Sequence, residues 1–119
     1  MCSYSAIALQ KEADSYLRKI ADSCLNHYFT LQGWETGIVT ESFILNSDGT
    51  VSQIKIIIHP QKYGTKQTWI GADKALILAV QNAAPFPKPP SALHTPVKLI
   101  LTIDGSDLNK ALKAKVDVR

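Results

Sequence analysis

The chain has 119 residues, of which 45% are hydrophobic, and it carries a formal net charge of +3. This length suits a single domain over residues 1–119, and the apolar content is enough for a packed core, which excludes intrinsic disorder. The basic residues gather only near the end of the chain and lack the interleaved aromatic side chains of a nucleic-acid surface. No apolar run approaches the roughly 20 residues that span a bilayer, so we expect a soluble domain without nucleic-acid or membrane contact.

The first predicted element is an amphipathic helix over residues 5–28. Its apolar positions recur at the three- and four-residue spacing of one helical face: Ala6, Leu9, Ala13, Leu17, Ile20, Cys24 and Tyr28. Because Cys24 falls on this stripe, we expect a buried thiol rather than a reactive one. Cys2 would lie about 33 Å away along the same helix, so we expect no disulfide between the two cysteines.

Two stretches rich in β-branched residues follow, at residues 38–46 and 51–59. Asp48 and Gly49 between them predict a tight hairpin turn. The second stretch predicts an inward row of three isoleucines, Ile54, Ile56 and Ile58. In the first stretch Glu41 shares an otherwise apolar face. A dry carboxylate there is costly, so either water reaches Glu41 or it pairs with a basic group of the protein or of a partner.

A second helix is predicted to end near Ala84, where a proline-rich arm begins. Its apolar face is mostly alanine, which suits close packing on a sheet: Ala72, Ala75, Leu76, Ala79, Val80 and Ala83. A third strand follows over residues 97–103, and the core of the domain spans about residues 5–104. For residues 105–119 the spacing of Leu108, Ala111 and Leu112 predicts a short helical or flexible tail.

The order α-β-β-α-β predicts an α+β fold with a three-stranded, antiparallel-type sheet of order 2-1-3 and both helices packed on one face. The third strand would then form an open edge, on which another protein could add a strand. The predicted partner-binding residues are those of this edge: Val97, Lys98, Leu99, Ile100, Leu101, Thr102 and Ile103.

The sequence holds no pattern typical of catalysis or metal binding. His27, His59 and His94 are scattered and lack partners at ligand spacing, so a structural role is expected for each. Asp73 falls near the start of the second helix, where a carboxylate stabilises the positive end of the helix dipole. We therefore expect no enzyme, no metal and no cofactor, and Glu41 is the single polar residue that we single out for a possible functional role.

Several motifs together resemble the C-terminal periplasmic domain of the TonB/TolA energy-transducer family, closer to its TolA-like branch. These motifs are Gly37-x-Val39, Phe43, Asp48-Gly49-x-Val51, Ile54-x-Ile56, Asp73-x-Ala75, Ala79-Val80 and Ala84-Pro85-Phe86-Pro87-x-Pro89-Pro90. The resemblance covers roughly residues 12–104. It implies a periplasmic, protein-binding domain, anchored to the inner membrane if the chain is a fragment, which couples to envelope proteins and which colicins and phage coat proteins exploit as a receptor.

In that family, partner segments commonly add a strand at the edge of the third strand, which agrees with the edge that the topology predicts. An alternative is a complete small soluble protein of the same fold, such as a cytoplasmic immunity or inhibitor protein that neutralises a toxin. The unpaired thiols favour this alternative, whereas the mildly basic charge disfavours an inhibitor of nucleases. For both alternatives the partners are proteins, and the chain is expected to be a monomer or a weak dimer.

Overall fold

The computed structural model describes residues 2–28, 37–59, 70–105 and 112–119, with side chains from residue 8 in the first helix and from residue 73 in the second. The predictions for Cys2, Ala6 and Ala72 lie outside these described side chains. The elements are, in chain order, α1 (Cys2–Asn26), β1 (Gly37–Leu45), β2 (Val51–Ile58), α2 (Ile70–Ala83), the 3-10 helix η1 (Ser91–Leu93), β3 (Val97–Gly105) and β4 (Lys113–Val118). The α+β class is confirmed.

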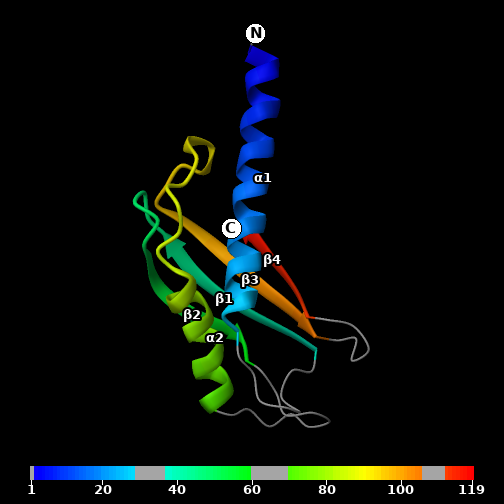
Figure 1. Cartoon of the computed structure of the whole chain (residues 1–119), viewed down its shortest axis with the longest axis vertical. Coiled ribbons are helices and arrows are strands. Elements are labelled where there is room, and N and C mark those ends of the chain that lie inside the picture. The colour runs from blue at the N-terminus through cyan, green and yellow to red at the C-terminus, as the bar shows by residue number, and fades with distance from the viewer. Residues whose placement is uncertain (1, 29–36, 60–69, 106–111) are drawn as a thin grey trace.

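The described strands form one antiparallel sheet with the order β2-β1-β3-β4 (Figure 1). β1 pairs with β3 in regular register from Gly37↔Gly105 to Leu45↔Val97. The predicted neighbours of β1 are therefore confirmed, but the sheet has four strands rather than three. The additional strand, β4, pairs with β3 from Leu99↔Val118 to Asp104↔Lys113.

The predicted helical or flexible tail is wrong over residues 113–118, which form β4. In this strand Ala114, Val116 and Val118 alternate with charged residues, and Val116 is buried. This two-residue period is the pattern of a half-buried strand, and β3 offers an unpaired row of backbone groups beside it. The ladder with β3 therefore determines the conformation of residues 113–118, whereas the helical spacing predicted at Leu108 and Ala111 lies outside the described residues.

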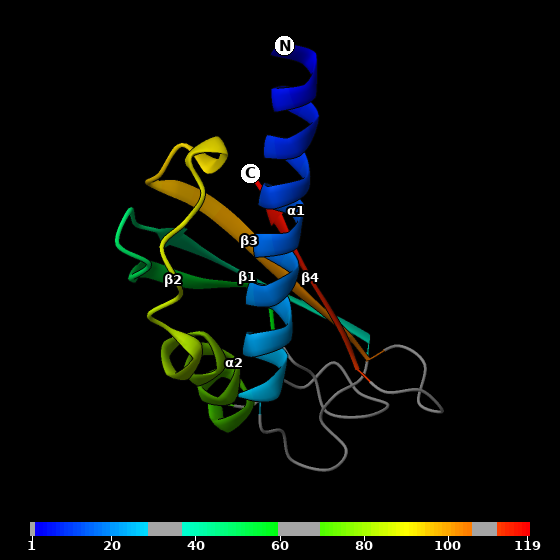
Figure 2. The same cartoon turned by 45° about the horizontal axis from the view of Figure 1, so that its top comes forward.

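Both helices lie side by side on one face of the sheet, as predicted (Figures 1 and 2). The buried core between helices and sheet includes Ile20, Cys24, Val39, Phe43, Leu45, Leu76, Ala79, Val80, Leu99, Leu101 and Ile103. The predicted burial of Cys24 is confirmed, and among the described residues it is a free cysteine. Within the described residues, no helix has the length and hydropathy needed to cross a membrane.

β2 departs from the regular strand that the sequence predicts. Its register against β1 shifts twice, between Thr40 and Glu41 and between Ser42 and Ile44. The first shift leaves Ile57 unpaired and places Ile58 opposite Thr40, on the face away from the helices. Ile58 is 48% exposed, so its predicted place in the inward isoleucine row is wrong.

The proline arm after α2 packs into the fold through Phe86. Its backbone N–H donates to the Gly49 carbonyl at 2.9 Å, and its ring stacks on Phe43 with the centroids 6.5 Å apart. The Tyr16 hydroxyl of α1 donates to the next carbonyl, that of Pro87, at 2.6 Å. The arm therefore ties the hairpin turn and α1 together before the chain enters β3.

Candidate functional site: the groove between α1 and β4

The predicted open edge at β3 is wrong, because β4 pairs along it. Leu99, Leu101 and Ile103 are buried under the helices. Lys98, Ile100 and Thr102 alternate with them and lie on the opposite face of the sheet. Together with Val97, these seven predicted residues form an interior strand, so they offer no free backbone groups to a partner segment.

The corresponding free edge belongs to β4. The backbone N–H of Arg119 donates to the Lys98 carbonyl at 3.0 Å, so this position points its backbone towards β3. In an antiparallel ladder alternate residues point their N–H and C=O groups to opposite sides. Ala114, Val116 and Val118 therefore point these groups away from β3. No further strand lies beside β4 within the described part of the chain.

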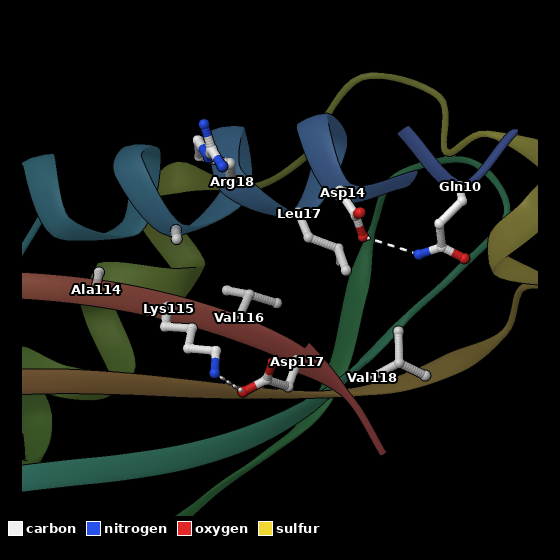
Figure 3. Close-up of a pocket in the computed structure, with 10 residues that line it drawn as sticks. Gln10, Asp14, Leu17, Arg18, Ala114, Lys115, Val116, Asp117 and Val118 are labelled. Atoms are coloured by element: carbon white, nitrogen blue, oxygen red, sulfur yellow. Dashed lines mark hydrogen bonds and ion pairs between the residues drawn. The ribbon is translucent and has the colours of Figure 1, made fainter. Parts of the chain in front are cut away.

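A groove of about 400 Å³ runs between this edge and α1 (Figure 3). Its lining residues are Gln10, Asp14, Leu17, Arg18 and Ala21 of α1, and Ala114, Lys115, Val116, Asp117 and Val118 of the strand. Leu17 and Val116 point towards each other across its floor (Figure 3). Val118 is 49% exposed, which is unusual for a valine beside a core. The groove thus combines an apolar floor with unpaired strand backbone.

Charged side chains of both signs lie on the two elements that form this groove, and those of Lys115 and Asp117 point away from α1 (Figure 3). On α1, the amide of Gln10 donates to the Asp14 carboxylate at 2.9 Å. On β4, the Lys115 ammonium lies 3.6 Å from the Asp117 carboxylate, and these two side chains are 75% and 54% exposed. Because exposed pairs of this kind contribute little to stability, Lys115 and Asp117 are available for other partners.

A second hollow, of about 480 Å³, lies between α1 and the proline arm. Tyr16, Ile20, Phe86 and Pro87 line it, and the hydrogen bond from Tyr16 to Pro87 crosses this region. Burial raises the pKa of the Tyr16 hydroxyl, which therefore stays a donor in this bond at neutral pH. This hollow lacks the free strand edge of the first groove, so it offers side chains but no backbone ladder to a guest.

Glu41, the polar residue singled out in the sequence, is fully buried on β1, between Leu101 of β3 and Ile56 of β2. Neither carboxyl oxygen has a hydrogen-bond partner among the described residues. Glu41 is therefore not exposed to solvent, and no basic group among the described residues pairs with it, while pairing with a basic group of a partner stays a prediction. Burial raises the pKa of Glu41 to about 8, so the side chain is mostly a neutral acid at pH 7.

Two of the histidines have polar neighbours close in the fold, and the buried thiol is protonated. His59 lies 3.0 Å from the Asp73 carboxylate in the first turn of α2, and the ring of His27 contacts the Ser23 carbonyl at 2.8 Å. Burial, followed by the charge of Glu41, raises the pKa of the Cys24 thiol to about 12, which leaves it unreactive. The described residues include no group of histidine, cysteine and acidic side chains that could hold a metal ion.

No protein-family model, curated protein sequence or solved structure matches this chain. None of the residues predicted to bind a partner lines the groove. They lie on β3, the strand that pairs directly with β4. The alternation of Ala114, Val116 and Val118 with charged residues is the signal that could have located the edge.

Proposed function

We propose that this chain is a protein-binding module that captures an extended segment of a partner by strand addition at the free edge of β4. The observation that supports this proposal is the groove between α1 and β4, where outward backbone groups adjoin a cavity of about 400 Å³. Backbone hydrogen bonds give such docking its affinity, and pockets for alternate side chains give it specificity. A guest strand would place every second side chain over the apolar floor of the groove.

The guest's remaining side chains would lie on the other face, beside Lys115 and Asp117. Residues directly opposite in an antiparallel pair interact most closely, so an acidic residue is favoured opposite Lys115 and a basic one opposite Asp117. Lysines on an edge strand also discourage unselective pairing. The edge therefore favours a segment with a defined charge pattern over any exposed strand.

The resemblance to the TonB/TolA family supports a periplasmic role in cell-envelope energy transduction. Within this proposal the partners are envelope proteins, and colicins or phage coat proteins use the same edge as a receptor. The strand-addition site assigned to the family at its third strand is here replaced by the next strand, β4, because β3 is already paired.

The test is a selection of ten-residue peptides from a random phage-displayed library on the immobilised chain. Selected peptides should bind wild type and lose at least about tenfold in affinity, measured by isothermal titration, when Val118 is replaced by proline. Proline removes an outward N–H at this edge position without removing a bond to β3. Amide NMR shifts on titration should cluster at residues 114–118 and 14–21.

The matched control is Val118→Ala, which shortens the same side chain but keeps the N–H donor. It should retain most of the affinity if the backbone carries the docking. Peptides that bind the Val118→Pro chain as well as wild type, or whose NMR shifts fall on β2 or on the proline arm instead, would refute docking at the β4 edge.

A further inference from the structure

The charges next to Val116 on β4 have opposite signs on its two sides. Lys115 and Asp117 flank it on one face of the sheet, and Ala114 and Val118 flank it on the groove face. Two copies of β4 laid antiparallel with their Val116 residues opposite each other would set Lys115 of each copy against Asp117 of the other. Ala114 of each would then meet Val118 of the other on the groove face.

From this pattern we infer that the occupant of the β4 edge, in the absence of a partner, is β4 of a second copy of this chain. The inference rests on the proposed function in so far as both use the same free edge. It adds the identity of one occupant, with a defined register and symmetry, and it makes the dimer and a heterologous guest mutually exclusive.

The backbone supports the same register. Ala114, Val116 and Val118 point their N–H and C=O groups away from β3, as the bond from Arg119 to Lys98 requires. Pairing at Val116 therefore matches outward residues with outward residues, because Ala114 meets Val118 and Val116 meets itself. The charged pair Lys115 and Asp117 then occupies the non-hydrogen-bonded positions, where cross-strand side chains lie closest.

Neighbouring registers are disfavoured by like charges at the symmetry axis or by the loss of pairing between outward residues. A shift by two residues in one direction sets Lys115 against itself at the symmetry axis, and a shift in the other direction sets Asp117 against itself. A shift by one residue would match the groove face of one copy with the opposite face of the other. The register about Lys115 would also form two complementary pairs, Lys113 with Asp117, but it sets Val118 against Leu112, outside β4. Only the register about Val116 pairs all three outward residues within the strand, although it leaves Lys113 opposite Arg119 at each end.

The groove wall formed by α1 is compatible with this arrangement. A two-fold axis perpendicular to the sheet at Val116 keeps the helices of both copies on the same face and sets the two α1 helices antiparallel. Asp14 and Arg18 line the groove on this wall, so each copy presents one acidic and one basic side chain towards the joint. The result would be a continuous eight-stranded sheet with no free β4 edge.

Charge reversal on β4 tests this inference with the purified chain alone. Sedimentation velocity from about 1 µM to about 500 µM should show a reversible rise from the 13.1 kDa monomer towards twice that mass. Lys115→Glu and Asp117→Lys, each alone, should stay monomeric over this range, because each sets like charges opposite one another twice. Both side chains are exposed, so circular dichroism should report folded variants.

An equimolar mixture of the Lys115→Glu chain and the Asp117→Lys chain should restore the dimer, because both cross-strand pairs become complementary again. The double variant Lys115→Asp/Asp117→Lys should dimerise with itself. A wild-type chain that stays monomeric throughout, or single variants that dimerise like wild type, would overturn the inference. A monomeric wild type that still binds selected peptides at β4 would leave the proposed function standing. A chain that dimerises but binds no peptide, even at concentrations at which it is monomeric, would refute only the proposed function.

Discussion

The two edge strands of the sheet, β2 and β4, differ in how readily a further strand could pair with them. The β2 edge is irregular: two register shifts interrupt its pairing with β1, and Gln53 adopts a φ of 52°. The β4 edge is regular along all six positions of its pairing with β3. Bulges twist an edge strand and break the flat template that a further strand needs, so β2 is protected and β4 is open.

The difference extends to how each edge is held. The β1–β2 hairpin is fixed at its turn, where Phe86 bonds to Gly49, whereas β4 has Val116 as its one buried residue within the described chain. A firmly anchored, irregular edge suits a structural border. A regular edge with few buried side chains suits pairing with a strand of another chain. The variants below test this contrast, from the largest expected effect to the smallest.

Replacing Gly49 should weaken the anchored side of the sheet most. Gly49 has a φ of +87°, and a Cβ there would lie 1.9 Å from the Phe86 carbonyl oxygen. Gly49→Ala therefore combines an unfavourable backbone conformation with a clash against backbone, and we expect a loss of more than about 3 kcal/mol of unfolding free energy. Urea denaturation measures it. Ser47→Ala, at an exposed position of the same turn, is the control, and equal losses in both variants would contradict the steric explanation.

Glu41 lies on β1, which connects the two halves of the sheet, and it should make the stability depend on pH. Its pKa of about 8 in the folded chain lies above the ordinary 4.5, so the folded state holds the proton more tightly than the unfolded state. Stability is then highest below pH 4.5 and falls as the pH rises towards 8, by on the order of 3 kcal/mol at pH 7.

Glu41→Leu should remove this pH dependence and stabilise the chain increasingly between pH 5 and about 8. The measurement is the difference in unfolding free energy between wild type and variant across that range, which cancels the contributions of other titrating groups. A difference that stays constant with pH would show that the carboxyl titrates normally in the folded chain.

Val116 tests how lightly β4 is held. Because it is the buried side chain of this strand, Val116→Ala should cost about 2 kcal/mol and should mainly release β4. Hydrogen exchange should then accelerate at residues 113–118 while β1 amides keep their protection. Val118→Ala, at a half-exposed position of the same strand, is the matched control with a smaller cost. Uniform acceleration across the whole sheet would instead make β4 part of the cooperative core.

The smallest effect is expected at Gln53 on the β2 edge. A glutamine at a φ of 52° is strained, and glycine adopts this conformation without the steric cost of a side chain. Gln53→Gly should therefore stabilise the chain by up to about 1 kcal/mol in thermal unfolding, whereas Gln53→Val should destabilise it. If valine were tolerated as well as glycine, the irregularity of β2 would not be fixed by this residue.

The sequence was sufficient for the elements with strong periodicity and insufficient where the periods are short or interrupted. The two helices, the hairpin turn at Asp48 and Gly49, and the alternation through Leu99, Leu101 and Ile103 all follow from local pattern. The place of Ile58 could not be predicted, because a bulge changes the face of every later residue in a strand without changing the composition.

The candidate site was also misplaced, because the strand that forms it has a weak sequence pattern. β4 has six residues, and its alternation begins with the small Ala114, so the apolar signal is weaker than the helical spacing just before it. The partner-binding edge was therefore predicted one strand too early, at β3. The sequence placed Glu41 on the apolar face of its strand, but its burial without a hydrogen-bond partner among the described residues depends on how the neighbouring strands pack against it.

The origin of the groove walls has a consequence for the order of folding. One wall comes from α1 and the other from the last strand, and α1 is tied to the proline arm by a hydrogen bond between residues 71 positions apart. Contacts of such long sequence separation form late, because loop closure must be achieved first. The groove should therefore be among the last features to mature, so that a nascent or partly folded chain has no docking surface to present.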